Sequence, residues 1–398
     1  MTAVRHVDIA ERRRRLLVRH HLAAPASGVE QVANDLVGLH SSDPATVVLA
    51  ARARLDPFVV ADIEDALYER RTLLRMLAMR RTMFVVPLDL AAVLQASCTN
   101  ALVPGERRKL LSMLGEAGVA KDVDAWIARL EAETLAVLAE HGPLAANQLT
   151  KLIPDLALQF KVAVGKRYEG TIGVSTRLLF LMSTQGLIAR TRPLGTWISS
   201  QYRWSRMVDW IGELPALDVS DARVEVVARW LRAYGPGTLE DLAWWTKWTK
   251  AEVRAALRAN QAVEVIADLD DAGSTAAAWV LPDDLDDTPD PGSSVNLLPG
   301  LDPTIMGWRD RGWYLGPHRA PLFDRNGNAG PTVWVDGRAV GAWSQRAGGQ
   351  VVTALLEPVG RTSQRRIAAA ASRLSDWMDG VRVTPRFPTP LDRELATS

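Results

Sequence analysis

The sequence has one cysteine, Cys98, among its 398 residues, and it has no long apolar run. A single cysteine excludes an intrachain disulfide and a cluster of thiolate metal ligands. A membrane-spanning helix needs about 18 consecutive apolar residues, and none occur here. The first residues, MTAVRHVDIAERRRR, also lack the apolar centre of a signal peptide. These absences predict a cytoplasmic protein without a membrane partner.

Several motifs of catalysis and cofactor binding are also missing. The sequence contains no Walker loop, no G-x-G-x-x-G, no H-E-x-x-H and no G-x-S-x-G. The six histidines are not spaced with cysteine or acidic residues as metal ligands would be. No lysine stands out as a Schiff-base nucleophile. We therefore expect no metal and no cofactor.

The charge is nearly balanced overall but unevenly distributed. The formal net charge is +1, and residues 1–210 carry 27 Lys and Arg against 21 Asp and Glu. The rest of the chain is acidic, with 20 against 25. A mildly basic half is compatible with contacts to DNA phosphates, and equally with solvated helix faces.

Helical patterns followed by a pair of strand-like runs occur three times. The strand pairs fall at 71–87, 187–204 and 262–282, each after two or more helical segments. In the third unit, Thr238 with Asp241 and Thr249 with Glu252 have the spacing of capping boxes. Helices followed by a hairpin are typical of a winged helix, so we expect three such units at irregular spacing.

An acidic, proline-containing stretch, DDLDDTPDPGSS, reads as a linker before a change of pattern. Beyond it, short strand-type runs alternate with glycine turns, followed by a helix (RTSQRRIAAAASRLSDWMDG) and a final strand (VRVTPRF). We predict an α+β fold with three tandem winged-helix units and a C-terminal β-rich, barrel-like domain. The predicted domains are 1–120, 121–215, 216–288 and 289–398.

The stretch GLHSSDP, residues 38–44, places polar groups between two helical patterns. Asp43 followed by Pro44 is a favourable helix start, with Asp as N-cap and Pro at the first helical position. Ser42 is a second possible cap, and His40 is compatible with a buried structural histidine. The same residues can also act on water, because a histidine side chain changes charge near neutral pH and a carboxylate supports a developing cation.

Four stretches carry a resemblance to a known family. They are GLHSSDP (38–44), MRRTMFVVP (79–87), LRAYGPGTLEDLAWW (231–245) and LLPGLDPTIMGWRDR (297–311), followed by LFDRNG and VWVDGRAVGAW. Together they resemble the AlkZ/YcaQ-like DNA glycosylases over nearly the whole chain. In characterised members the catalytic motif is Gln-Φ-Gln or Gln-Φ-Asp, whereas the slot here reads His40-Ser41-Ser42, with Asp43 next.

The resemblance implies a monofunctional glycosylase that hydrolyses the N-glycosidic bond of bulky or crosslinking N7-alkylpurine adducts. It also implies a monomer whose chain forms a C-shaped channel for double-stranded DNA. His40, with Ser42 and Asp43, is the candidate group that activates water. The candidate DNA-binding residues are Arg75, Arg80, Arg81, Thr82, Lys166, Arg167, Tyr168, Asp302, Trp308, Arg309 and Arg311. Asp302 and the Gly-Trp-Arg-Asp-Arg run either line the channel or brace it through Asp–Arg ion pairs.

Two other functions remain open at this point. The missing glutamines favour a winged-helix protein that binds DNA without cleaving it, whereas His40 and Asp43 favour the enzyme. A transcriptional regulator is a third alternative. It fits less well because the sequence shows neither coiled-coil heptads nor a separate dimerisation or ligand domain.

Overall fold

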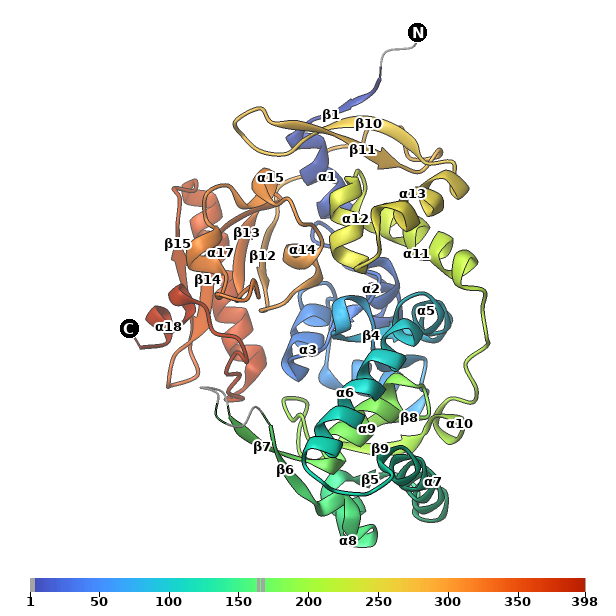
Figure 1. The fold of residues 1–398 in the computed structure, drawn as a ribbon. Helices are drawn as coiled ribbons and strands as arrows, with labels where there is room; N and C mark the ends of the chain where they lie inside the picture. Colours follow the sequence, from blue (N-terminus) through green and yellow to red (C-terminus); the bar gives the residue numbers. More distant parts are fainter. Residues whose placement is uncertain (1–3, 163–164, 166–168, 398) are drawn as a thin grey trace. The chain divides into compact units, whose positions relative to one another are not determined.

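The protein has a mixed α+β fold, as the sequence predicts (Figure 1). The structure, a computed structural model, describes residues 4–162, 165 and 169–397. The chain forms two compact units, one from residues 1–63 and 223–398 and the other from residues 64–222. The finer prediction of tandem winged helices around a DNA channel, and its domain boundaries, stay predictions.

The first unit, which we call the split unit because two separate parts of the chain form it, contains the candidate catalytic motif. Its N-terminal elements are β1 (His6–Val7), α1 (Ile9–Arg19), α2 (Val29–Asp35), β2 (Leu39–His40), α3 (Pro44–Arg52) and most of α4 (Val60–Glu64). Its middle elements are most of α11 (Val219–Tyr234), α12 (Leu239–Thr246), α13 (Lys250–Ala259), β10 (Val263–Asp268) and β11 (Thr275–Val280). Its C-terminal elements are β12 (Val295–Leu298), α14 (Pro303–Met306), α15 (Gly312–Leu315), α16 (Arg319–Leu322), β13 (Thr332–Val335), β14 (Arg338–Gln345), β15 (Val351–Leu355), α17 (Arg361–Met378) and α18 (Pro390–Thr397).

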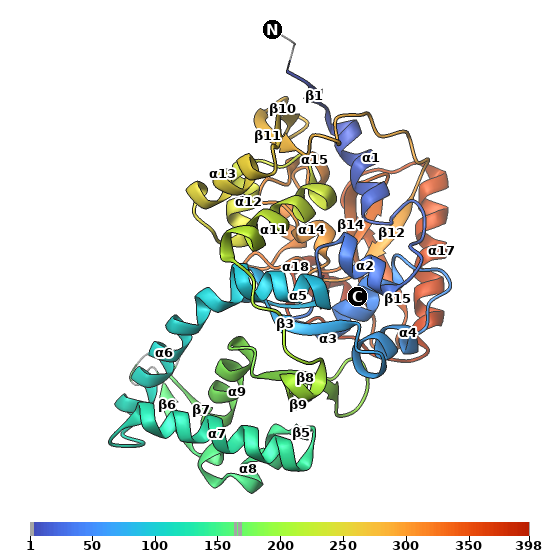
Figure 2. The same cartoon turned by 90° about the vertical axis from the view of Figure 1, so that its right-hand side faces the viewer.

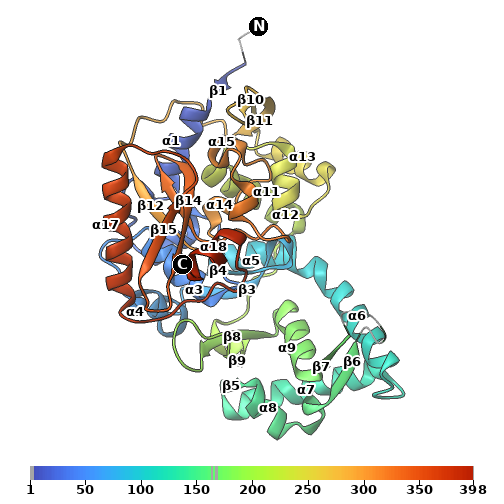
Figure 3. The same ribbon diagram turned by 90° about the vertical axis from the view of Figure 1, so that its left-hand side faces the viewer.

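The C-terminal part of this unit is built on an antiparallel sheet in the order β12-β13-β14-β15. The long helix α17 packs against β12 and β15 (Figure 3). The predicted helix is therefore confirmed. The predicted last strand, VRVTPRF, is wrong, since residues 381–387 form no strand. Pro385 has no N–H group to donate to a neighbouring strand, which disfavours pairing there.

In the middle part, side-chain caps determine where two helices begin. Thr238 and Asp241 cap α12 reciprocally, and Thr249 and Glu252 cap α13 in the same way. Both predicted capping boxes are thus confirmed. The hairpin β10–β11 follows, and β1 adds to it as a parallel third strand.

Aromatic side chains form much of the core of the split unit. The Trp308 ring stacks on His20 at 5.8 Å between centroids and meets Tyr234 edge-on at 5.1 Å. Trp313 and Tyr314 extend this cluster. Trp245 is also buried here, in contact with Tyr234.

The second unit combines two β-hairpins with a largely helical region (Figure 2). Its first elements are η1 (Asp65–Glu69), β3 (Leu73–Leu77), η2 (Met79–Arg81), β4 (Met83–Pro87), α5 (Leu88–Leu94), η3 (Gln95–Thr99), η4 (Asn100–Leu102) and α6 (Val103–Glu116). Its later elements are α7 (Val123–His141), β5 (Leu144–Ala145), α8 (Ala146–Leu152), η5 (Pro154–Ala157), β6 (Gln159–Val162), β7 (Gly170–Gly173), α9 (Val174–Thr184), β8 (Ile188–Pro193), β9 (Tyr202–Arg206) and α10 (Met207–Trp210).

Both strand pairs predicted in this unit are present. β3 and β4 are antiparallel, with Leu77 opposite Met83, and β8 and β9 form the second pair. Helices α7, α8 and α9 pack around a shared apolar core that includes Leu130, Leu149 and Leu178.

Candidate active site

The GLHSSDP junction changes chain direction between two short helices. Val37 has a φ of 52° and Gly38 a φ of 101°, so the chain leaves α2 through two left-handed residues. A β-branched residue is strained in this conformation, whereas glycine adopts it freely. The turn leads into β2 and then into Asp43 at the start of α3.

Asp43 is the N-cap of α3. Its Oδ1 accepts a hydrogen bond from the Ala45 N–H at 3.1 Å, and Pro44 occupies the first helical position. The predicted helix start is therefore confirmed. Capping occupies one lone pair of the carboxylate, which has about four, so it leaves room for chemistry. Asp43 is half-buried, so solvent can reach it.

His40 lies deeper than Asp43, with 3% of its surface exposed. The Ser42 N–H donates to its Nδ1 over 3.4 Å. Because a backbone N–H can only donate, Nδ1 is the acceptor, and the neutral ring then carries its proton on Nε2. In this tautomer Nε2 is a donor.

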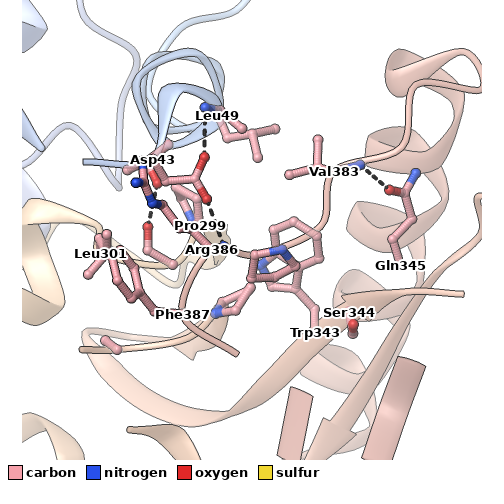
Figure 4. A pocket seen from close by; sticks show the side chains of 16 residues that line it. Asp43, Leu49, Pro299, Leu301, Trp343, Ser344, Gln345, Val383, Arg386 and Phe387 are labelled. Atoms are coloured by element: carbon pink, nitrogen blue, oxygen red, sulfur yellow. Dashed lines mark hydrogen bonds between the residues drawn. The ribbon is translucent and has the colours of Figure 1, made fainter. Parts of the chain in front are cut away.

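The second oxygen of Asp43 is bound by a segment near the end of the chain (Figure 4). The Arg386 N–H donates to Asp43 Oδ2 at 3.1 Å, and the Arg386 guanidinium donates through Nη1 to the Ser42 carbonyl at 3.0 Å. We call residues 381–388 the C-terminal strap. Together with α3, the loop at 299–301 and β14, this strap lines a pocket beside Asp43. Sequence reasoning missed Arg386 altogether.

The C-terminal strap is fixed at its other end by Gln345. The Gln345 side chain accepts from the Val383 N–H at 2.9 Å and donates to the Val381 carbonyl at 2.9 Å. Trp343, on the same strand, donates through Nε1 to the Leu298 carbonyl. The pocket wall next to Asp43 is therefore held by side-chain to backbone hydrogen bonds on β14.

Asp302 braces α3 from its far end. Its carboxylate pairs with the Arg54 guanidinium through two bonds of 2.7 and 2.9 Å, and neither side chain is exposed to solvent. Nearer the start of α3, the Thr46 hydroxyl donates to the Gly300 carbonyl at 2.8 Å. The loop that contains Asp302 thus holds both ends of the helix that begins at Asp43. Of the two roles predicted for Asp302, the geometry supports bracing by an Asp–Arg ion pair.

The Gly-Trp-Arg-Asp-Arg run is held by a buried carboxylate. Asp241 Oδ1 accepts the N–H groups of Arg309 at 2.8 Å and of Asp310 at 3.1 Å. Burial raises the pKa of Asp241 above its usual value, against the opposing effects of the nearby Arg12 charge and of hydrogen bonds from Asp310 and Thr238. Arg309 is exposed, and its side chain therefore remains a candidate DNA contact.

Besides Asp302, three of the predicted DNA-binding residues are buried within their own units. Trp308 is 2% exposed and donates to the Tyr234 carbonyl at 3.0 Å. The Arg311 guanidinium lies over the Trp244 and Phe323 rings, and that of Arg75 lies over Tyr202. A direct contact of these side chains with DNA does not fit their burial, so that prediction is corrected: the three side chains pack inside their units.

The first hairpin presents its arginines as the sequence predicts. Arg80 and Arg81 form its tip, with φ values of 53° and 59°. Arg81 is exposed, yet its guanidinium pairs with Glu106 at 2.5 and 2.9 Å. The Thr82 hydroxyl donates to the Met79 carbonyl and thereby closes the turn. The predicted residues Lys166, Arg167 and Tyr168 lie outside the described residues.

Two further properties of the described residues concern metal binding and the membrane. Within residues 4–162, 165 and 169–397, no three His, Cys, Asp or Glu side chains are grouped so that they could hold a metal ion. Over the same residues, none of the helices combines the length and the apolar character needed to cross a membrane.

Comparison with known proteins identifies the family. The family model for AlkZ-like DNA glycosylases matches residues 33–377. Among solved structures, the chain is similar to the DNA glycosylase AlkZ of Streptomyces sahachiroi, with a TM-score of 0.66 and 21% sequence identity. That match covers 93% of this chain and 97% of AlkZ. No curated protein sequence matches significantly. The chain belongs to the AlkZ-like DNA glycosylase family, and the family supports a DNA glycosylase that acts on DNA.

Proposed function

We propose that this protein is a monofunctional DNA glycosylase that hydrolyses the N-glycosidic bond of bulky or crosslinking N7-alkylpurine adducts in double-stranded DNA. The observation that carries the proposal is the half-buried Asp43 carboxylate beside His40 and Ser42, in a chain of this family. It acts as a monomer without metal or cofactor.

An N7-alkylated purine already carries a positive charge, so the leaving group needs no protonation by the enzyme. The remaining tasks are to support a sugar that becomes cationic and to present water to C1′. A carboxylate suits the first task, because it stabilises positive charge as that charge develops. We assign this role to Asp43.

His40, with Ser42, activates the water. A ring with its proton on Nε2 donates to the water oxygen and so orients it, while the Asp43 carboxylate is available to accept the water proton. This division of roles predicts that an amide in place of the imidazole retains part of the activity, since a glutamine side chain also donates through Nε2.

The test is single-turnover release of modified purine from a duplex with one defined bulky N7-guanine adduct, detected by alkaline cleavage of the abasic site. Asp43→Asn keeps an N-cap, because asparagine caps helices about as well as aspartate. It removes the negative charge and one of the two oxygens, the one that accepts the Arg386 N–H. We expect its rate to fall at least about tenfold, a threshold below the contribution of about 10²–10⁴-fold that positioned acid–base groups typically make. His40→Ala is expected to fall as far, and His40→Gln less.

The matched control is Asp8→Asn, which changes the N-cap of α1 in the same unit. Its rate should equal that of the wild type. If wild type releases no purine from several N7 adducts but still binds the duplexes, the proposal is wrong, and the alternative of a winged-helix protein that binds without cleaving takes its place.

A further inference from the structure

Arg386 places a positive charge next to the candidate catalytic motif. Its side chain is exposed, and its guanidinium donates to the Ser42 carbonyl, a neutral group. Among the described residues, no carboxylate oxygen lies within 4.0 Å of this guanidinium, although Asp43 accepts the N–H of the same residue. The charge of Arg386 is therefore not neutralised by an ion pair.

We propose that Arg386, on the C-terminal strap, binds a phosphate of the DNA strand beside the nucleotide under attack. The location of this contact rests on the function proposed above. The contact itself is a separate claim about DNA binding.

The signs of the two charges carry the argument. A nucleotide whose glycosidic bond is breaking has a sugar that becomes positive and flanking phosphates that stay negative. Asp43 and Arg386 have the complementary charges, a carboxylate for the sugar and a guanidinium for a phosphate (Figure 4). The guanidinium binds the Ser42 carbonyl, and the Asp43 carboxylate binds the Arg386 N–H, so the two charges do not form an ion pair. A guanidinium is well suited to phosphate, because its planar donors match the phosphate oxygens.

The strap is also held in place before DNA arrives. Gln345 binds the backbone on either side of residue 382, and Pro385 and Pro388 restrict the chain around Arg386. A contact from a preorganised segment loses less conformational entropy on binding than one from a flexible tail.

The test measures binding to a short duplex with an uncleavable tetrahydrofuran abasic site, over a salt titration. Each neutralised phosphate contributes about 0.9 to the slope of log affinity against log salt. We expect Arg386→Ala to reduce the slope by about 0.9. The ratio of its Kd to that of the wild type then falls about 3.5-fold as salt rises from about 50 to about 200 mM. Arg386→Lys keeps the charge and should keep the slope.

Arg382→Ala is the matched control, since Arg382 is exposed on the same strap but donates to the Arg346 carbonyl, away from Asp43. Its slope should match that of the wild type. Equal slopes for the wild type, Arg386→Ala and Arg382→Ala would overturn the proposal, even if the wild type releases modified purines. A changed slope for Arg386→Ala alone supports it, even if no purine is released.

Neutral methylphosphonates then locate the contact. Each phosphate within two nucleotides of the abasic site is replaced in turn, in both strands. At one flanking position the substitution should weaken binding by the wild type and have no further effect on Arg386→Ala, as a double-mutant cycle requires for a direct contact. Independent effects at every position would place the arginine away from the lesion and refute this proposal.

Discussion

The buried ion pair between Arg54 and Asp302 gives the sharpest stability prediction. Replacing Asp302 with asparagine leaves the Arg54 guanidinium with no exposed surface and no counter-charge. The same guanidinium also donates to the His20 and Ala50 carbonyls, so it cannot turn towards solvent without breaking those bonds. Removing one partner of a buried pair costs about 3–5 kcal/mol.

For a unit of this size, that loss corresponds to a decrease in melting temperature of about 6–20 °C, at about 2–4 °C per kcal/mol. The assay is urea and thermal unfolding followed by far-UV circular dichroism and tryptophan fluorescence. The control is Asp283→Asn, the same chemical change in an exposed pair with Arg232 in the same unit. It should leave the midpoint unchanged.

The result that would refute the reasoning is an Asp302→Asn midpoint equal to that of the control. The structure also predicts a functional effect, because the loop with Asp302 holds α3 and hence Asp43. Below its unfolding midpoint, Asp302→Asn should lower the rate of purine release while Asp283→Asn does not.

The remaining predictions concern a buried histidine and two glycines. Burial, and then the Arg54 charge, lower the pKa of His20 well below its ordinary value. Below a pH of about 6.5 the unfolded chain therefore binds more protons than the folded protein does. The free energy of unfolding then falls as the pH drops, by at most about 1.4 kcal/mol per pH unit. Urea midpoints between pH 5 and 7.5 should show this decrease in the wild type, and a less steep one in His20→Gln; parallel profiles would contradict it. Gly237→Ala should destabilise by about 1–3 kcal/mol or more, because a Cβ there would lie 2.1 Å from the Trp230 ring. Gly105→Ala, in helix α6 with open space around it, should instead stabilise by up to about 1 kcal/mol, and thermal melts of both variants check the pair.

The sequence predicted those parts of the fold that depend on neighbouring residues. Thr238 and Thr249 each bind a carboxylate three residues away, and Asp43 binds the second residue after it. The hairpin at Arg80 and Arg81 is local in the same way. Such features are specified by short spacings, and spacing can be read directly from a sequence.

Short elements were predicted less well. GWYL (312–315) is one of the short apolar runs beyond the linker for which the pattern predicts a strand, and it forms the one-turn helix α15. Helix α18 was not predicted at all. A run of four apolar or aromatic residues fits a strand and a buried helical turn equally well, so periodicity cannot separate them. Here the aromatic core decides, because Trp313 and Tyr314 both pack inward from a single turn.

In the candidate site, too, residues close in sequence could be predicted and contacts between distant parts of the chain could not. His40, Ser42 and Asp43 could be predicted because they are consecutive and because family resemblance marks their position. The partners that hold Asp43 in place could not, since Arg386 lies 343 residues further along the chain and Arg54 and Asp302 are separated by 248. No short-range pattern relates such positions.

The capping role of Asp43 does not exclude a catalytic role, because two different N–H groups bind its carboxylate. A carboxylate that only caps a helix needs one N–H donor, and Ala45 supplies it. The second donor, from Arg386, binds the other oxygen and fixes the plane of the carboxylate while lone pairs on both oxygens stay available. A carboxylate fixed in this way, at a half-buried position, is preorganised for a developing positive charge, which is what electrostatic catalysis requires. Capping and chemistry are therefore compatible at Asp43, and the capping interaction contributes to the geometry that the proposed chemistry needs.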